Sequence, residues 1–185
     1  MEDSILIVDD EPNVISALTR VFIDEPYRTY SANSAPDAME ILKKHSIKVV
    51  ISDERMPEIS GSEFLSMVRE QFPHIIRIML TGHASIEAAM KAINEGEIYR
   101  FFTKPWNNMD IRFAVKAAID KYNLEEENRR LLNIIRQQVL NIKLLERQFP
   151  GISKLDRDEN GRIIVPNMSE DEIAQIVAKC ERKFI

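Results

Sequence analysis

The residues best suited to chemistry are an acidic pair, Asp9-Asp10, a lone aspartate, Asp53, a threonine, Thr81, and a lysine, Lys104. Each of them follows an apolar run of the kind that forms a buried strand. Three carboxylates in one small crevice repel one another unless a cation neutralises them. Since the ligands are hard oxygens and the protein cage is incomplete, Mg²⁺ is the expected metal. The sequence therefore predicts a magnesium site built from these carboxylates.

A carboxylate beside such a metal ion can act as a nucleophile on phosphorus. Phosphoryl transfer needs mostly in-line positioning and charge neutralisation, which the metal and a lysine supply. Asp53 is the predicted acceptor because it stands alone at its strand end, whereas Asp9 and Asp10 are better placed to hold metal. Lys104 offers a positive charge to one phosphoryl oxygen, and the Thr81 hydroxyl can donate to another.

The strands and helices that must position these residues are predicted from alternating apolar runs and amphipathic stretches. The runs are Ile5–Val8, Val49–Ile51 and Ile75–Leu80, with weaker candidates at Arg28–Ala32 and Ile98–Phe102. Helical patterns lie at Asn13–Asp24, Ala35–His45, Ser62–Phe72 and Ser85–Glu95, and another begins near Asn108. This alternation predicts an α/β fold with a doubly wound, five-stranded parallel sheet. The working crevice of such a sheet lies beyond the carboxyl ends of its strands.

The last helical pattern continues without Gly or Pro to about Phe149, which predicts a helix of roughly forty residues. Its apolar stripe fits a two-stranded coiled coil and therefore a homodimer formed after residue 122, although it could also fold back on its own domain or on the tail. Asn128 at an a position fits a parallel dimer. The a positions are Lys121, Asn128, Ile135 and Ile142, and the d positions are Leu124, Leu131, Gln138 and Leu145, with Leu132 and Val139 widening the stripe.

The expected domains are residues 1–122, a helical extension at 123–149 and a small tail at 150–185. The sequence of the tail predicts a β-hairpin around Asp158-Glu159-Asn160-Gly161 and a final helix from Ser169. The same turn has partial calcium-loop spacing, but Asn167 stands where a bidentate Glu is needed, so a hairpin turn is the preferred interpretation.

Bulk properties limit the partners. A net charge of −5 argues against nucleic acid, and Cys180, the single cysteine, excludes a disulfide within the chain and a zinc cluster. No segment has the roughly 18 apolar residues of a membrane span, and the N-terminus carries acidic residues where a signal peptide has basic ones. We expect a cytoplasmic protein that contacts neither membrane nor nucleic acid.

Four motifs, IVDDEP, ISDERMPEISG, IMLTGH and FFTKPW, occur in the order typical of response regulator receiver domains of two-component signalling. The chain resembles that family over about residues 4–122. The resemblance implies a flavodoxin-like fold and a Mg²⁺ held by Asp10, Asp53 and the backbone carbonyl of Arg55, with Asp9 supporting through water. It also implies a phosphoryl donor that is a histidine kinase or phosphotransfer protein, and slow self-catalysed phosphorylation and dephosphorylation rather than enzyme activity.

The resemblance further implies a switch in which Thr81 moves toward the phosphoryl group and the aromatic side chain at Phe101 turns inward. Phe101 departs from the common tyrosine and lacks its hydroxyl, so a plain core phenylalanine is the alternative. The residues of these motifs are similar to those in the receivers of HD-GYP proteins and hydrogenase regulators. The output domains of those proteins are not found in this sequence. The chain is then a stand-alone regulator that switches dimerisation or partner binding, or a fragment of a longer regulator.

Three other functions compete with this interpretation. A constitutive dimeric adaptor would keep the fold without the switch. A haloacid-dehalogenase phosphatase needs Asp-x-Asp, but Glu11 stands two residues after Asp9. A flavodoxin-like cofactor carrier needs a hydroxyl-rich phosphate loop after the first strand, where this chain has DDEPN.

Overall fold

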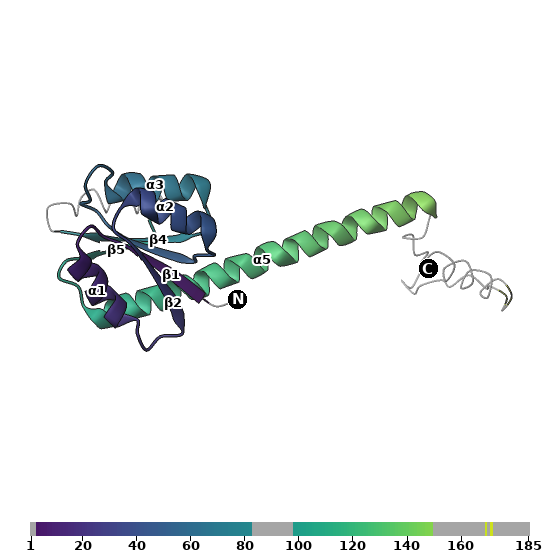
Figure 1. The fold of residues 1–185 in the computed structure, drawn as a ribbon. Helices are drawn as coiled ribbons and strands as arrows, with labels where there is room; N and C mark the ends of the chain where they lie inside the picture. The colour runs from purple at the N-terminus through teal and green to yellow at the C-terminus, as the bar shows by residue number, and fades with distance from the viewer. Residues whose placement is uncertain (1–2, 83–97, 150–168, 170, 172–185) are drawn as a thin grey trace. The chain divides into compact units, whose positions relative to one another are not determined.

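The computed structural model describes residues 3–82 and 98–149, together with Ser169 and Asp171. The chain divides into two units, Met1–Arg130 and Leu131–Ile185. The predicted helix at 85–95 and the predicted hairpin and helix of the tail lie outside the described residues. The strands are β1 Asp3–Val8, β2 Tyr27–Ala32, β3 Val49–Asp53, β4 Ile76–Thr81 and β5 Arg100–Thr103, and the helices are α1 Pro12–Val21, α2 Ala35–Lys44, α3 Gly61–Gln71 and α5 Asn108–Gln148 (Figure 1).

The strands form one parallel sheet in the order β2-β1-β3-β4-β5. The predicted doubly wound, five-stranded α/β fold is therefore confirmed, with strand and helix limits shifted by up to three residues from the sequence estimate. The strand order reverses direction between β1 and β3, and ligands of such sheets bind at this switch point. Asp9 directly follows β1 and Asp53 is the last residue of β3, so both lie beside it.

Helices cover both faces of the sheet, α2 and α3 on one face and α1 and the first part of α5 on the other (Figure 1). Because successive strand residues point to opposite faces, Leu6 and Val50 belong to the layer under α2 and α3, while Ile7 and Ile51 belong to the layer under α1 and α5. Both layers consist of buried apolar side chains, and close packing of such side chains holds the strand ends in place.

Local signals in the sequence fix the helix that follows the Asp53 loop. Ser60 accepts a hydrogen bond from the Glu63 backbone N–H, and the Glu63 carboxylate accepts one from the Ser60 backbone N–H. This capping box satisfies two of the free N–H groups at the start of α3. The end of the loop that leads into α3 is therefore fixed by defined hydrogen bonds.

A buried lysine at the opposite end of the sheet fastens α5 to the strands. Lys48 precedes β3, and its ammonium lies 2.5 Å from Asp3 Oδ1 and 2.6 Å from Asn123 Oδ1. The same ammonium lies 5.6 Å from the ring centroid of Tyr122. A buried charge is costly unless it is paired in this way, so these contacts specify where α5 packs up to Asn123.

Further along α5 the side chains lose contact with the sheet. The buried residues of the helix end at Ile119, and the large apolar side chains beyond it are exposed. They are Leu124, Leu131, Leu132, Ile134, Ile135, Val139, Leu140, Ile142, Leu144, Leu145 and Phe149. The predicted long helix is confirmed, whereas its pairing with a second copy stays a prediction. None of the described helices is both long and apolar enough to cross a membrane.

Candidate functional site

Two buried carboxylates face the crevice at the carboxyl ends of β1 and β3. Asp9 has no exposed surface, and Asp53 is 5% exposed. The backbone N–H of Glu11 donates to Asp9 Oδ1 at 2.9 Å, and that of Arg55 donates to Asp53 Oδ2 at 2.8 Å. A hydrogen bond from the residue two positions later is the usual way in which an aspartate orders its own turn. One oxygen of each carboxylate is thereby fixed, and the other faces the crevice.

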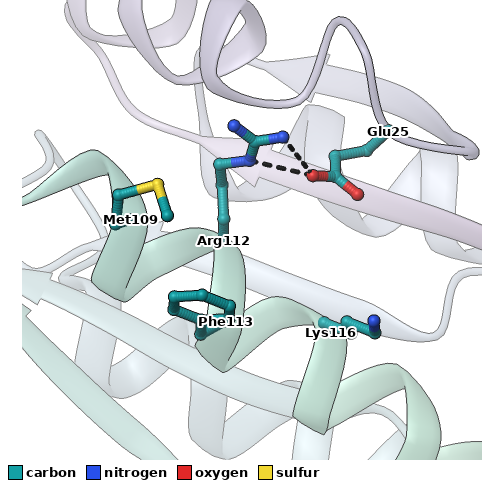
Figure 2. Close-up of a pocket in the computed structure, with 5 residues that line it drawn as sticks. All are labelled: Glu25, Met109, Arg112, Phe113 and Lys116. Carbon is teal, nitrogen blue, oxygen red and sulfur yellow. Dashed lines mark hydrogen bonds and ion pairs between the residues drawn. The ribbon is translucent and has the colours of Figure 1, made fainter.

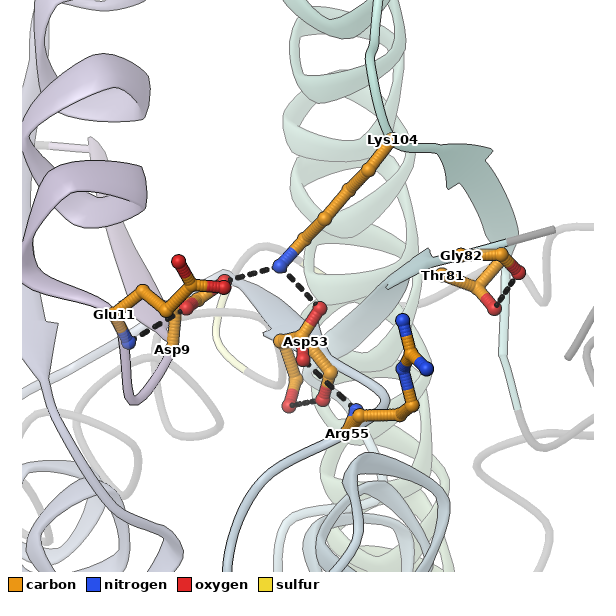
Figure 3. A network of polar contacts seen from close by, with 8 residues as sticks. Asp9, Glu11, Asp53, Arg55, Thr81, Gly82 and Lys104 are labelled. Atoms are coloured by element: carbon orange, nitrogen blue, oxygen red, sulfur yellow. Dashed lines mark hydrogen bonds and ion pairs between the residues drawn. The ribbon is translucent and has the colours of Figure 1, made fainter. Parts of the chain in front are cut away.

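Lys104 lies between these two free oxygens. Its Nζ atom is 2.9 Å from Asp9 Oδ2 and 2.5 Å from Asp53 Oδ1 (Figure 3). The lysine directly follows β5, and its backbone N–H donates to the Thr81 carbonyl at 2.9 Å. The Lys104–Pro105 peptide bond is cis. Residues from three different strand ends therefore meet at one ammonium group.

The pKa values of this group reflect burial and pairing. Burial raises the pKa of Asp9 above its usual range, although the hydrogen bond from Lys104 opposes the effect. Burial acts to lower the pKa of Lys104, but its hydrogen bonds to Asp53 and Asp9 outweigh that effect and raise the pKa. The raised pKa means that the two carboxylates stabilise the charged form of Lys104.

The oxygen atoms of the crevice suit a hard cation. Carboxylate oxygens without nitrogen or sulfur ligands favour Mg²⁺ over zinc. However, the described residues contain no group of three or more acidic, histidine or cysteine side chains gathered as for a metal ion. The structure brings together Asp9 and Asp53, while Asp10 is only partly buried and contributes no contact to Lys104. The carboxylate oxygens of Asp9 and Asp53 are ligands that fit magnesium, and Asp10 is adjacent to Asp9 in the chain.

The two predicted switch residues belong to neighbouring strands: Thr81 is the last residue of β4, and Phe101 lies within β5. Thr81 is fully buried, and its hydroxyl donates to the Gly82 carbonyl at 3.0 Å (Figure 3). Phe101 is partly buried and packs against the apolar layer under α2 and α3. The Thr81 hydroxyl must therefore rotate before it can donate to a group on Asp53.

Two neighbours of Asp53 were not singled out as site residues by sequence reasoning. Gly61 packs so closely that a Cβ atom there would lie 2.0 Å from the Asp53 carbonyl oxygen. Glu54 is partly buried, accepts a hydrogen bond from Ser62 Oγ at 3.0 Å, and has a pKa raised chiefly by desolvation. Gly61, the glycine of the MPEISG motif, was the one sign in the sequence that the backbone comes close here. Its contact with the Asp53 carbonyl could not be predicted, because that contact depends on how the loop after β3 closes.

Replacing Gly61 with alanine should disrupt the Asp53 loop. The new methyl group would overlap backbone atoms of Asp53 and Glu54, which cannot rotate away. We expect a loss of about 3 kcal/mol in the free energy of unfolding, as for a strongly overpacked core. Urea unfolding followed by circular dichroism measures this change.

Gly82→Ala is the matched control. A Cβ atom there would lie 3.0 Å from Nη2 of Arg55, the far end of a flexible side chain that can move. Its effect on the free energy of unfolding should stay below about 1 kcal/mol. Equal effects of the two alanine substitutions would contradict the specific role of Gly61.

Comparisons with known proteins show which family and fold this chain resembles. The model of the response regulator receiver domain matches residues 5–116. The hydrogenase transcriptional regulatory protein HoxA of Cupriavidus necator is 35% identical over 128 residues, which are 69% of this chain and 26% of HoxA. The chain thus spans about a quarter of the length of that curated relative.

Solved structures show the same similarity. The signal receiver domain of an HD domain-containing protein from Pseudomonas fluorescens Pf-5 is 32% identical, with a TM-score of 0.64 over 68% of this chain and 93% of that one. A response regulator receiver domain protein from Clostridium thermocellum is 30% identical, with a TM-score of 0.62 over 66% of this chain and 98% of that one. The relatives thus include a hydrogenase regulator and the receiver domain of an HD domain-containing protein.

Proposed function

Since this chain belongs to the response regulator receiver family of two-component signalling, we propose that it accepts a phosphoryl group on Asp53. The observation that carries the proposal is the placement of Lys104 between the free oxygens of Asp9 and Asp53. The donor is a histidine kinase or a phosphotransfer protein, and the chain acts as a phosphoacceptor. We also assign it to the cytoplasm, where such donors present their phosphohistidine.

The transfer requires one nucleophilic oxygen and two sources of positive charge. Oδ1 of Asp53 attacks phosphorus as the bond from phosphorus to the donor histidine nitrogen breaks, and that nitrogen keeps the electron pair. Asp53 Oδ2 remains held by the Arg55 backbone N–H, which orients the carboxylate. Lys104 then pairs with a phosphoryl oxygen instead of the Asp53 oxygen, and Thr81 donates to another after its hydroxyl turns away from Gly82.

Magnesium completes the charge balance of this proposal. Asp10, Asp53 and the backbone carbonyl of Arg55 would hold it, with Asp9 supporting through water. Bound there, Mg²⁺ neutralises negative charge on the phosphoryl oxygens. The buried carboxylate oxygens beside Lys104 support this assignment, because hard oxygen ligands and a shared phosphate are the usual environment of Mg²⁺.

Phosphorylation would act on the output through the helix. Thr81 lies at the end of β4, whose neighbour β5 carries Phe101 and leads into α5. A movement of Thr81 toward the phosphoryl group leaves space that Phe101 can enter. We propose that this rearrangement controls homodimerisation or partner binding through the exposed apolar part of α5. A constitutive dimer with the same fold is the second candidate, favoured by the apolar stripe itself.

Lys104→Met tests the role of the bridging ammonium. Removing a fixed positive charge aimed at a transferring group typically costs about a hundredfold or more in rate. We expect the rate of Asp53 phosphorylation by acetyl phosphate and Mg²⁺, followed by intact mass, to fall by about that factor.

Lys43→Met is the control, because Lys43 is exposed on α2 and forms only a helix-surface ion pair with Glu40. It should leave the phosphorylation rate unchanged. Thermal unfolding of both variants separates a loss of chemistry from a loss of fold. An unchanged phosphorylation rate in folded Lys104→Met would show that the position of Lys104 between the two carboxylates does not support the proposed function.

A further inference from the structure

The last part of α5 is basic, although the chain as a whole carries a net charge of −5. From Asn128 to Phe149 the only acidic residue is Glu146. The basic residues of this stretch are Arg129, Arg130, Arg136, Lys143 and Arg147. A local excess of one charge, opposite in sign to the rest of the chain, indicates a contact surface for a partner of the other sign.

The first turns of α5 show what such a charge does when it is already paired. There Arg112 donates to Glu25 Oε1 through Nε at 2.8 Å and through Nη2 at 2.6 Å, beside a small hollow (Figure 2). Arg129 likewise pairs with Glu126 at 2.5 Å, and Arg130 lies 3.9 Å from Glu127. Within the described part of the chain, the other three basic residues of the last stretch form no ion pair, so their charges are available to a partner.

These three basic residues frame two exposed leucines. Leu140 and Leu144 are 60% and 56% exposed. Residues three or four positions apart on a helix lie on the same side, and five residues of α5 meet this condition together. This face, which we call the Leu140 patch, consists of Arg136, Leu140, Lys143, Leu144 and Arg147. Its members occupy b, c and f positions of the heptad, so the patch stays exposed in a coiled-coil dimer.

An acidic amphipathic helix matches this patch. Such a helix can cover the two leucines with its own apolar residues, and carboxylates at the edge of its apolar face can pair with the basic side chains. The C-terminal segment 169–184, for which the sequence predicts a helix from Ser169, has this chemistry. The structure describes Ser169 and Asp171 of this segment, and Asp171 is helical. The residues that share one face of the predicted helix are Glu170, Ile173, Val177, Cys180, Glu181 and Phe184.

We infer that the Leu140 patch receives the C-terminal segment 169–184 of the same chain, packed as an antiparallel helix. This contact lies on the side of α5 away from the predicted seam. It goes beyond the phosphoacceptor function and depends neither on Asp53 nor on dimerisation. It gives the tail a role, which is to cover a surface that another acidic helix could otherwise bind.

One antiparallel register satisfies the apolar residues. With Ile173 placed across from Leu144, Val177 lies across from Leu140, because each pair of neighbours on one helix is four residues apart. The apolar side chains of the two helices then cover one another and are removed from water, which stabilises the contact.

The same register pairs opposite charges. Glu170 lies across from Arg147, and Glu181 lies across from Arg136. On each helix the two charged residues stand on either side of the apolar ones. Surface ion pairs add little stability, but charges of opposite sign at both ends fix the alignment of the two helices.

The connection between the two helices permits this contact. Residues 150–168 can extend over roughly 60 Å, whereas packed helix axes lie only about 10 Å apart. The last part of α5 and the tail both belong to the second unit, Leu131–Ile185. A short tether keeps the segment at an effective concentration in the millimolar range, so a modest intrinsic affinity is sufficient for docking.

Gln137→Cys in the full chain is the first test. In the inferred register Gln137 lies across from Cys180, the single cysteine of the chain. Mild oxidation should link the two positions within one chain, since a disulfide needs Cα atoms within roughly 7 Å. Peptide mapping identifies the linked residues, and a gel run without reductant shows whether the link joins two chains.

Gln138→Cys is the matched control. It changes the same residue type one position further along and leaves the tether almost unchanged, but position 138 points into the predicted seam. It should form no disulfide with Cys180. A disulfide of Cys180 with position 138 rather than 137, with position 137 of another chain, or with neither position would overturn the inference. Neither readout involves Asp53, so such a result would leave the proposed function unchanged.

A charge exchange tests the register by a second route. Docking shields the Cys180 thiol, so its rate of reaction with a thiol reagent reports how often the segment opens. Arg147→Glu replaces an attraction with a repulsion and should raise this rate about fivefold. Adding Glu170→Arg to the same chain should restore the wild-type rate. An unchanged rate in Arg147→Glu, or no recovery in the doubly substituted chain, would contradict the pairing, provided that circular dichroism shows α5 to be helical in each variant.

Discussion

Asp53→Asn abolishes phosphorylation by acetyl phosphate and Mg²⁺ if Asp53 is the acceptor. The amide keeps the size of the carboxylate, and its single oxygen can still accept a hydrogen bond from either Lys104 or the Arg55 backbone N–H, which bind different oxygens of Asp53. It has no anionic oxygen to attack phosphorus. We therefore expect the added mass of one phosphoryl group in the wild-type chain and none in the folded variant.

The matched control is Asp24→Asn. Asp24 is exposed in the turn after α1 and takes no part in the crevice. Its phosphorylation should equal that of the wild-type chain in rate and extent. If the Asp53→Asn chain still gained a phosphoryl group, another residue would be the acceptor and the crevice would need a different interpretation.

Ile142→Asp dissociates the dimer that the heptad pattern predicts. Ile142 occupies an a position of the extension and is 52% exposed, so it is available to a partner helix. A dimer places two such carboxylates together in an apolar seam, where burying an unpaired charge costs about 3 kcal/mol or more. The dissociation constant should therefore rise about a hundredfold or more, as measured by light scattering across a concentration series.

Leu140→Asp is the control for this substitution. Leu140 lies two residues away on the same helix and is 60% exposed, but it occupies an f position outside the predicted seam. Both substitutions place the same charge on the same part of α5, so a general loss of helix stability would affect them equally. Equal dissociation by both variants, or by neither, would contradict the heptad assignment.

The sheet was predictable because strand burial is a local property of the sequence. Val49–Ile51 in β3 and Ile78–Leu80 in β4 are uninterrupted apolar runs, as expected for strands covered on both faces. The length of α5 was predictable from the missing helix breakers between Asn108 and Gln148. The limits of β5 were less certain, because Arg100 and Thr103 are not apolar.

The residues that form the site were predictable from the sequence, but the ion pairs between them were not. Strand ends of a parallel sheet converge, so Asp9, Asp53 and Lys104 were expected in one crevice. The sequence assigned Lys104 to a phosphoryl oxygen, whereas the structure pairs it with both carboxylates. Which ions pair depends on the side-chain directions and the local charge balance, and sequence spacing specifies neither.

The close packing around Gly61 and the exposed side of α5 also could not be predicted from the sequence. Gly61 is excluded from carrying a side chain by the Asp53 carbonyl, a contact that exists only once the loop after β3 has closed. Which residues of α5 are exposed likewise depends on which side of the helix the sheet covers. Met109 and Phe113 could have belonged to the core on hydrophobicity alone, and the structure leaves them exposed.

The most direct test of the central claim is to locate the phosphoryl group chemically. An acyl phosphate on aspartate is reduced by borohydride to homoserine with release of phosphate, whereas phosphate esters on hydroxyl side chains are not. The wild-type chain, incubated with acetyl phosphate and Mg²⁺, reduced and digested, should yield homoserine at position 53 and no such product without Mg²⁺. Homoserine at a different aspartate, or none after a measured phosphoryl mass gain, would contradict the assignment of Asp53 as the acceptor.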